Sequence, residues 1–320
     1  MNARTFQQLL DAVEGLSYQQ GEQVAAALQR RSLRQQAIAI IEAQPRHALA
    51  CPRCCSTQLH RHGRAHGLQR FRCVPCGRTA NRLTGTPLAR LRHKGKWLPY
   101  LAGMLASRTV RGAAALTGIH RNTSFRWRHR FLINAKLDRQ LPLRGITEAD
   151  ETYLLESQKG ARHLTRPARR RGGVARKRGL SSEQVCILVA RERSGSTVDF
   201  VTGRAPLTCT QLDRHLAPNL ALAPDCVLVT DGHPAYATFA RRCGIVHHAV
   251  NVSDGARVEG DWHVQNVNAY HSRFKQWLRH FHGVASRYLE NYLGWRWAID
   301  GERISSAEEL LRAALCASPI

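Results

Sequence analysis

Four cysteines constrain the fold of this chain more than any other feature of its sequence. They form two CxxC pairs separated by eighteen residues, and they are Cys51, Cys54, Cys73 and Cys76. Each pair places two thiolates at the tip of a tight turn, and four thiolates suit tetrahedral Zn²⁺. The surrounding segment is too poor in aliphatic residues to bury a core of its own, so it needs a metal to fold. The pattern predicts a zinc ribbon at residues 49–84.

Four protein ligands leave no open coordination position, so this zinc is expected to be structural. Other candidate ligands lie nearby, namely Cys55, His60, His62 and His66, but none has the paired spacing of the CxxC motifs. We expect these residues at the surface of a ribbon whose outer face is basic. Reduced cysteine without a metal is the alternative reading.

The charge of the chain points to a polyanionic partner. Its 320 residues include 48 Lys and Arg against 23 Asp and Glu, a formal net charge of +25. No apolar run reaches the roughly eighteen residues of a membrane span, so nucleic acid is favoured over membrane. The first residues lack the apolar core of a secretory signal, which predicts a reducing cytoplasm and cysteines that are not disulfide-bonded.

Helical patterns flank the cysteine segment. Residues 1–48 are expected to form a helical segment with a packing role, and residues 95–138 a helix-turn-helix module, because small residues precede Gly118 and a second helix follows it. Candidate DNA contacts at the start of that second helix are Arg121, Asn122, Thr123, Arg126 and Arg128. An ordinary three-helix bundle with a solvated basic face is the alternative.

From about residue 145 the pattern changes to short β-like runs that alternate with helical stretches. This pattern predicts an α/β domain over 145–300, followed by a C-terminal helix over 301–320. A basic loop at 162–178 interrupts the domain. Its candidate DNA-binding residues are Arg169, Arg170, Arg171, Arg176, Lys177 and Arg178. A merely solvated basic loop is the other interpretation.

Carboxylates at strand ends are informative in so basic a chain, because they repel DNA unless a cation intervenes. Asp150 and Asp231 occupy such positions, and Asn268 on the following amphipathic helix is a candidate third ligand for a divalent metal. Rival ligands are Glu148, Glu151, Glu259 and Asp261. Glu148 is the more serious rival, since it shares a strand face with Asp150 whereas Glu151 points away. For His233, His263 and His271 we expect a surface or packing role.

Three motifs carry a resemblance to a known family. They are ADETY at 149–153, VTDGHPAY at 229–236 and HVQNVNAYHSRFKQWLRHFHGV at 263–284. Together with the ribbon, helical module and basic loop in this order, they resemble the ISXO-like, zinc-ribbon-bearing insertion-sequence transposases of bacteria. The resemblance implies an RNase H-like catalytic domain whose triad falls on Asp150, Asp231 and Asn268, with Lys275 as the basic position of the same helix. Asn268 departs from the commoner glutamate, because an amide brings no negative charge and cannot act as a base.

The resemblance further implies Mg²⁺- or Mn²⁺-dependent strand cleavage at element ends and transfer to target DNA. It also implies at least a homodimer, acting at the nucleoid in the bacterial cytoplasm. Two rival functions are weighed against this one. The first is a non-catalytic DNA-binding regulator derived from a transposase, and the second is a nuclease of the same fold that cuts without joining.

Overall fold

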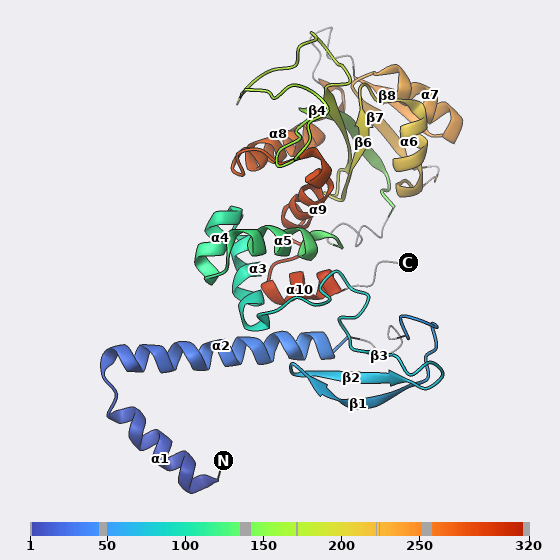
Figure 1. Ribbon diagram of the computed structural model, residues 1–320. Coiled ribbons are helices and arrows are strands. Elements are labelled where there is room, and N and C mark those ends of the chain that lie inside the picture. Colours follow the sequence, from blue (N-terminus) through green and yellow to red (C-terminus); the bar gives the residue numbers. More distant parts are fainter. Residues whose placement is uncertain are drawn as a thin grey trace. The chain divides into compact units, whose positions relative to one another are not determined.

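The computed structural model describes residues 2–44, 50–134, 142–170, 172–221, 223, 225–250 and 258–315. The chain divides into two compact units. The first comprises Met1–Phe131 together with Ser306–Ile320, and the second comprises Leu132–Ser305. The architecture is mixed α/β (Figure 1), as the sequence predicts. Among the described helices, none is both long and apolar enough to cross a membrane.

Helices dominate the first unit. They are α1 (Ala3–Glu14), α2 (Tyr18–Glu42), α3 (Trp97–Leu105), α4 (Val110–Thr117), α5 (Arg121–Leu132) and α10 (Ala307–Leu315). The helical segment expected at residues 1–48 therefore consists of two helices. The break has a local cause, because Ser17 and Gln20 form a reciprocal capping box that starts α2. The apolar residues of α1, among them Phe6 and Leu9, are exposed, so this part of the segment does not have the packing role expected for residues 1–48.

Helices α3 to α5 enclose an aromatic core. Trp97, Tyr100, Trp127 and Phe131 are buried, and the rings of Tyr100 and Trp127 meet edge to face at 5.3 Å. Gly118 ends α4 with a φ of 57°, a left-handed conformation that glycine adopts without strain. Helix α10 returns from the far end of the chain to pack against α2 and α3.

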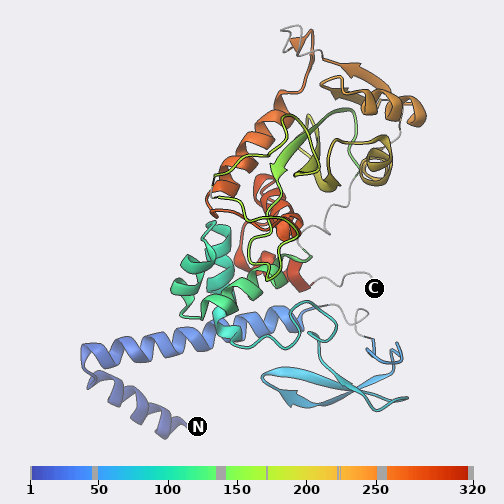
Figure 2. The same ribbon diagram turned by 45° about the horizontal axis from the view of Figure 1, so that its top comes forward.

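The cysteine segment is a small antiparallel sheet of order β1-β2-β3. Its strands are β1 (Leu59–Ala65), β2 (Leu68–Cys73) and β3 (Thr79–Ala80). The turn between β1 and β2 lies directly on α2, because a Cβ added to Gly67 would meet Ile38 Cδ1 at 2.5 Å. Both ribbon views show this sheet beside the C-terminal half of α2 (Figures 1 and 2). A short 3-10 turn, η2 (Lys94–Lys96), then leads into α3.

The second unit is built on a five-stranded sheet of order β6-β5-β4-β7-β8. Its strands are β4 (Ile146–Leu155), β5 (Gln184–Glu192), β6 (Thr197–Arg204), β7 (Val227–Thr230) and β8 (Val246–Ala249). Strand β4 runs antiparallel to β5 and parallel to β7. A separate two-stranded ribbon joins β9 (Val258–Glu259) to β10 (Trp262–His263).

Helices cover both faces of this sheet (Figure 1). One face is covered by α6 (Cys209–His215) and α7 (Pro234–Cys243), and the other face by α8 (Gln265–Arg279) and α9 (Leu289–Asp300). Two 3-10 turns, η3 (Ala217–Asn219) and η5 (Ser286–Tyr288), lie in the connections. Side chains alternate along β5, so that Leu188 joins the core under α6 and α7 whereas Val189 joins the core under α8 and α9.

Candidate active site and metal centre

Two aspartates lie at equivalent places on neighbouring strands. Glu148 of β4 pairs with Val229 of β7 in the parallel ladder, and Asp150 and Asp231 each follow that pair by two residues. Residues two apart on a strand share a face, and neighbouring strands lie about 4.8 Å apart. The register thus brings the two aspartates together at the edge where β7 ends, with Asp150 in the middle of β4 and Asp231 directly after the last residue of β7.

Helix α8 brings a polar stripe to this edge. The Nδ1 atom of His271 lies 3.5 Å from Oδ2 of Asp150, and the His271 side chain is only 7% exposed. Asn268 lies three residues before His271 and Lys275 lies four residues after it, so the three side chains share one stripe of the helix. Asn268 and Lys275 therefore lie on the same side of α8 as His271. The Nε2 atom of His271 is buried without a hydrogen-bond partner among the described residues.

Glu148 fixes the start of α8. Its Oε2 accepts main-chain N–H groups of Asn266 at 2.8 Å and Val267 at 3.1 Å, and its Oε1 accepts the Asn266 side-chain amide at 2.6 Å. His263 Nδ1 lies 3.2 Å from the same Oε1. The carboxylate is fully buried, and three N–H groups of Asn266 and Val267 donate to its oxygens. Glu148 thus serves as the cap that Val264 cannot supply to α8.

The other rival carboxylates lie in different surroundings. Glu151 is on the opposite face of β4, where its Oε2 accepts the hydroxyl of Tyr236 at 2.9 Å. Burial raises the pKa of Glu151, and the charges of Asp150 and Asp231 raise it further. Asp261 is exposed in the turn before β10. The side chain of Glu259 lies outside the described part of the structure.

The two remaining histidines of the region have local structural roles. Nδ1 of His233 accepts the main-chain N–H of Ala235 at 3.2 Å and caps α7. His263 lies beside Glu148, as described above. The ring of His271 contacts a predicted ligand, because α8 buries it against Asp150. The main-chain N–H of His233 donates to Oδ1 of another, Asp231, at 3.2 Å.

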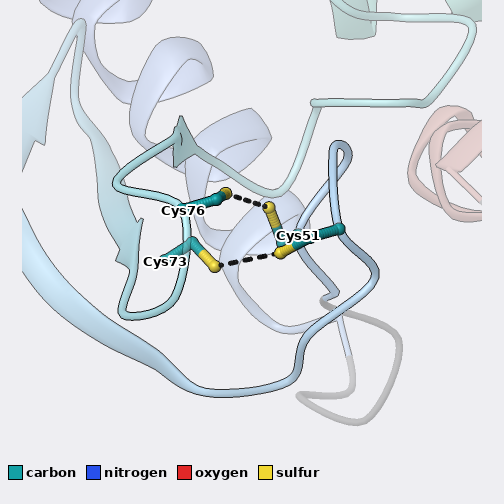
Figure 3. A group of neighbouring side chains, drawn as sticks. Cys51, Cys73 and Cys76 are labelled. Carbon is teal, nitrogen blue, oxygen red and sulfur yellow. Dashed lines mark hydrogen bonds between the residues drawn. The ribbon is translucent and has the colours of Figure 1, made fainter.

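The four predicted zinc ligands converge at one point, and Figure 3 shows three of them, Cys51, Cys73 and Cys76. Cys51 Sγ lies 3.4 Å from Cys76 Sγ, and Cys54 Sγ lies 3.5 Å from Cys73 Sγ. All four sulfurs lie within 4.8 Å of one another. Tetrahedral zinc with Zn–S bonds of about 2.3 Å requires sulfurs about 3.8 Å apart. The cluster therefore fits a closed, four-sulfur zinc site.

Surroundings of the cluster affect its thiols unequally. The main-chain N–H of Cys54 lowers the pKa of Cys51 to about 6, whereas burial raises the pKa of Cys73 to about 12. Cys55 is exposed and lies outside the cluster. His60, His62 and His66 are also exposed at the ribbon surface.

The residues predicted to contact DNA from α5 differ in access. Arg121, Asn122 and Arg126 are exposed, and Thr123 is half-buried. Arg128 is completely buried, and its guanidinium donates to the carbonyl oxygen of Arg108. Arg128 therefore holds the helices together and is not available to DNA.

The basic segment at 162–178 is fixed by two carboxylates. Glu156 forms ion pairs with Arg166 at 2.9 Å and with Arg204 at 2.8 Å. Oε1 of Glu183 lies 3.5 Å from Nη2 of Arg169. The other terminal nitrogen of Arg169, Nη1, donates to the carbonyl oxygen of Glu156 at 2.7 Å. Arg169 is thus a structural anchor as well as a candidate DNA contact.

The remaining cations of the segment project from it. Those that are exposed are Arg162, Arg170, Arg176, Lys177 and Arg178. Arg171, a further candidate, lies outside the described residues. Main-chain N–H of Arg176 donates to Glu183 Oε2 at 2.6 Å, so the exposed side chains are carried on an anchored backbone.

Comparison with known proteins connects this geometry to a family. Residues 142–297 match the family described as ISXO2-like transposase domain. The chain is 29% identical over 255 residues, 78% of its length and 84% of the relative's, to an uncharacterized protein in transposable element ISH50 of Halobacterium salinarum. These two matches confirm the resemblance to ISXO-like transposases that the sequence motifs indicated.

Two solved structures align with parts of this chain. A pre-cleavage Mos1 transpososome aligns at 12% identity over 69% of this chain and 78% of the other, with a TM-score of 0.23. The Mos1 strand transfer complex aligns at 14% identity over 63% of this chain and 74% of the other, with a TM-score of 0.22. Scores this low carry no argument about fold or mechanism.

Proposed function

Because residues 142–297 match the ISXO2-like transposase domain, we propose that this chain cuts DNA at the ends of a mobile element and joins those ends to target DNA. The contact between His271 and Asp150 carries the proposal. It sets the Asn268 stripe of α8 against the sheet edge where Asp150 and Asp231 emerge. We assign this unit to the RNase H-like fold, with catalytic residues Asp150, Asp231, Asn268 and Lys275.

The donor set at this edge fits a divalent metal. Asp231 and Asn268 are exposed, and the Asn268 amide makes no hydrogen bond to a described residue, so its oxygen is free to bind. Mg²⁺ or Mn²⁺ held by Asp150, Asp231 and Asn268 would neutralise charge on the reacting phosphodiester. Asn268 contributes an oxygen without charge, so the site offers two negative charges rather than three.

The chain's own groups would act on DNA in two steps. Water attacks a phosphorus at the element end, and the bond to the 3′-oxygen breaks to leave a free 3′-OH. That hydroxyl then attacks a phosphodiester of the target, forming one bond as another breaks, so no nucleotide is consumed. Lys275, on the stripe of Asn268, would hold a phosphate oxygen during both steps.

DNA would be held by parts of both units. In the first unit we assign the zinc-bound ribbon at 49–84, with structural zinc, and the three helices within 95–138 as a helix-turn-helix reader. Arg121, Asn122 and Arg126 support this assignment, because they are exposed at the start of α5. In the second unit, within 145–300, the anchored basic segment would bind phosphates. We expect the protein to act on paired ends as a homo-oligomer.

Strand cleavage and joining on element-end DNA with Mn²⁺ or Mg²⁺ tests the proposal. The wild type should nick the ends and transfer them, whereas Asp231→Ala should still bind the ends and leave them intact. Binding without any nicking by the wild type would support the regulator instead. Nicked ends that never join would indicate a nuclease.

A further inference from the structure

A cleft in the first unit has no part in the chemistry above. Its volume is about 1060 Å³, and it is bounded by α2, by the cysteine ribbon and by the segment from Asn81 to Gly95. Leu68 and Leu83, both buried, lie in its lining. Every residue that lines the cleft belongs to this one unit.

The cleft is strongly basic. Its lining includes the cations Arg34, Arg78, Arg90, Arg92 and Lys94, together with His66 and His93, and it includes no Asp or Glu. None of the five cations forms an ion pair with a carboxylate in the part of the chain that the structure describes. Burial and then the charge of Arg34 lower the pKa of Lys94. Five like charges around one hollow create a local potential that attracts a polyanion.

The walls of the cleft are rigidly built. A Cβ added to Gly95 would meet the carbonyl oxygen of Arg30 at 2.8 Å, so the backbone of the 90–95 segment touches α2. The indole N–H of Trp97 donates to the carbonyl oxygen of Arg92 at 3.0 Å and fixes the same segment from the other side. The cations are therefore presented by a backbone that packing holds in place.

Backbone strain is concentrated here as well. His66, Arg90 and His93 have φ values of 53°, 63° and 59°, in the left-handed region that non-glycine residues rarely adopt. All three line the cleft. Such conformations cost free energy, and they persist where the surrounding structure and its use require them.

We propose that this cleft binds the phosphodiester backbone of DNA, at a second site separate from α5 and from the aspartate edge. The inference rests on the proposed function, because it takes DNA as the polyanion. Arg34 and Arg78 stand on elements different from that of Arg90 and Arg92, so the cations can follow an extended strand. Guanidinium forks also match phosphate oxygens in pairs.

Binding of the full-length protein to a duplex of arbitrary sequence, measured across a salt series, tests this site. The double variant Arg34→Ala/Arg92→Ala should bind more weakly, and the slope of log affinity against log salt should fall by about two, roughly one for each lost phosphate contact. The matched control Arg4→Ala/Arg31→Ala removes the same charge from exposed positions of α1 and α2 outside the cleft. Its slope should stay near that of the wild type.

Photo-crosslinking shows directly whether DNA lies in the cleft. A photo-crosslinking amino acid at Thr84, which is exposed and lines the cleft, should capture the duplex, whereas the same group at Thr5 should not. Equal slopes for the two double variants, or no capture at Thr84, would overturn the inference. So would polyglutamate that binds as tightly as DNA and depends equally on Arg34 and Arg92, since the site would then suit an acidic peptide.

The cleft and the proposed function can fail separately. Duplex binding requires no cleavage, so loss of strand transfer in the wild type leaves the salt slopes and the crosslinks intact. Conversely, unchanged slopes in Arg34→Ala/Arg92→Ala would reject the cleft while cleavage at element ends continues.

Discussion

Glu148 and Asn266 are joined by two hydrogen bonds, one from the main-chain N–H of Asn266 at 2.8 Å and one from its side-chain amide at 2.6 Å. The pair ties β4 to the first turn of α8. Because Asp150 follows Glu148 on the strand and Asn268 follows Asn266 on the helix, this one buried carboxylate sets the spacing between two proposed metal ligands. Glu148 is thus a positioning residue.

The substitution Glu148→Gln should lower the free energy of unfolding by about 2 kcal/mol, because it leaves buried N–H groups facing an amide donor. Divalent-metal affinity should fall as well, since Asn268 loses its fixed place. Urea melts and Mn²⁺ titration measure the two effects. Glu302→Gln, at an exposed position of the same unit, is the control and should change neither. An unaltered Mn²⁺ affinity in a destabilised Glu148→Gln protein would show that the residue is structural alone.

A second buried carboxylate predicts a pH dependence of stability. Burial acts to raise the pKa of Asp300, but the hydrogen bond and charge of Arg273, with the charges of Arg296 and Arg191, outweigh it and hold that pKa below its ordinary value. A lowered pKa stabilises the fold above the unfolded-state value of about 3.9, and this stability is lost as the pH falls through the folded-state value.

Asp300→Asn should therefore cost about 1–3 kcal/mol at pH 7, since Arg273 is partly exposed and its share is screened by solvent. The difference from the wild type should shrink below about pH 4. Denaturant melts at several pH values measure it, with the exposed Asp261→Asn as the control. A gap that persists unchanged at acid pH contradicts the assignment to charge.

Adjacent cysteines offer a matched test of the ribbon. Cys54→Ser should abolish zinc binding and unfold β1 to β3, because the segment has no core to replace the metal. Cys55→Ser should keep a single zinc per chain, since Cys55 lies outside the sulfur cluster. Elemental analysis and hydrogen exchange of the ribbon amides report both. Retention of zinc by Cys54→Ser would remove this residue from the ligand set.

Because the proposed ligand Asn268 is neutral, a substitution that adds a negative charge there should raise the affinity for the metal. Asn268→Asp should raise Mn²⁺ affinity roughly tenfold, because a carboxylate replaces an amide in an oxygen-ligand site. Ala269→Asp adds the same charge about 100° around the helix and should have much less effect. Calorimetric Mn²⁺ titration distinguishes them. Equal gains in the two variants would mean that only the overall field has changed.

Exposed cations of the basic segment should act on DNA without supporting the fold. Arg176→Ala/Lys177→Ala should reduce the salt slope of DNA binding by up to about two and leave the melting temperature unchanged. Glu156→Gln should instead lower the melting temperature, because it releases Arg166 and Arg204. Thermal melts and salt-series binding separate the two roles. Loss of stability in the double variant would assign those cations to the fold.

Local patterns in the sequence were sufficient for some features and not for others. The mixed α/β architecture followed from alternating periodicities, and the cysteine spacing indicated where four sulfurs would meet. The role of Glu148 could not be predicted, because the strand pattern tells which face of the sheet a carboxylate occupies but not that three N–H donors lie within hydrogen-bond distance there. One signal was present, since the helix at 265 begins without a Ser, Thr, Asp or Asn cap and needs an acceptor from elsewhere.

The spacing of residues along the sequence revealed least about which polar side chains are buried. His271 was expected to be a surface or packing residue, and it is buried as a packing residue would be, with its ring 3.5 Å from Asp150, a contact that the sequence did not indicate. Arg128 was expected to reach DNA, yet it is enclosed among helices. Helical periodicity shows which residues share a side of one helix, but it does not show what packs against that side. The partner of His271 is Asp150, which lies more than a hundred residues earlier in the chain.

Helix α10 determines which of the two units can finish folding first during synthesis. Leu310, Leu311 and Ala314 of this helix are buried in the first unit, against α2 and α3. During synthesis, every strand of the aspartate-bearing sheet leaves the ribosome before α10 does. The unit that begins the chain is therefore the last to be finished. A copy of the gene with a frameshift after residue 305 would encode the whole aspartate-bearing sheet but leave the N-terminal unit without the helix that packs on α2 and α3.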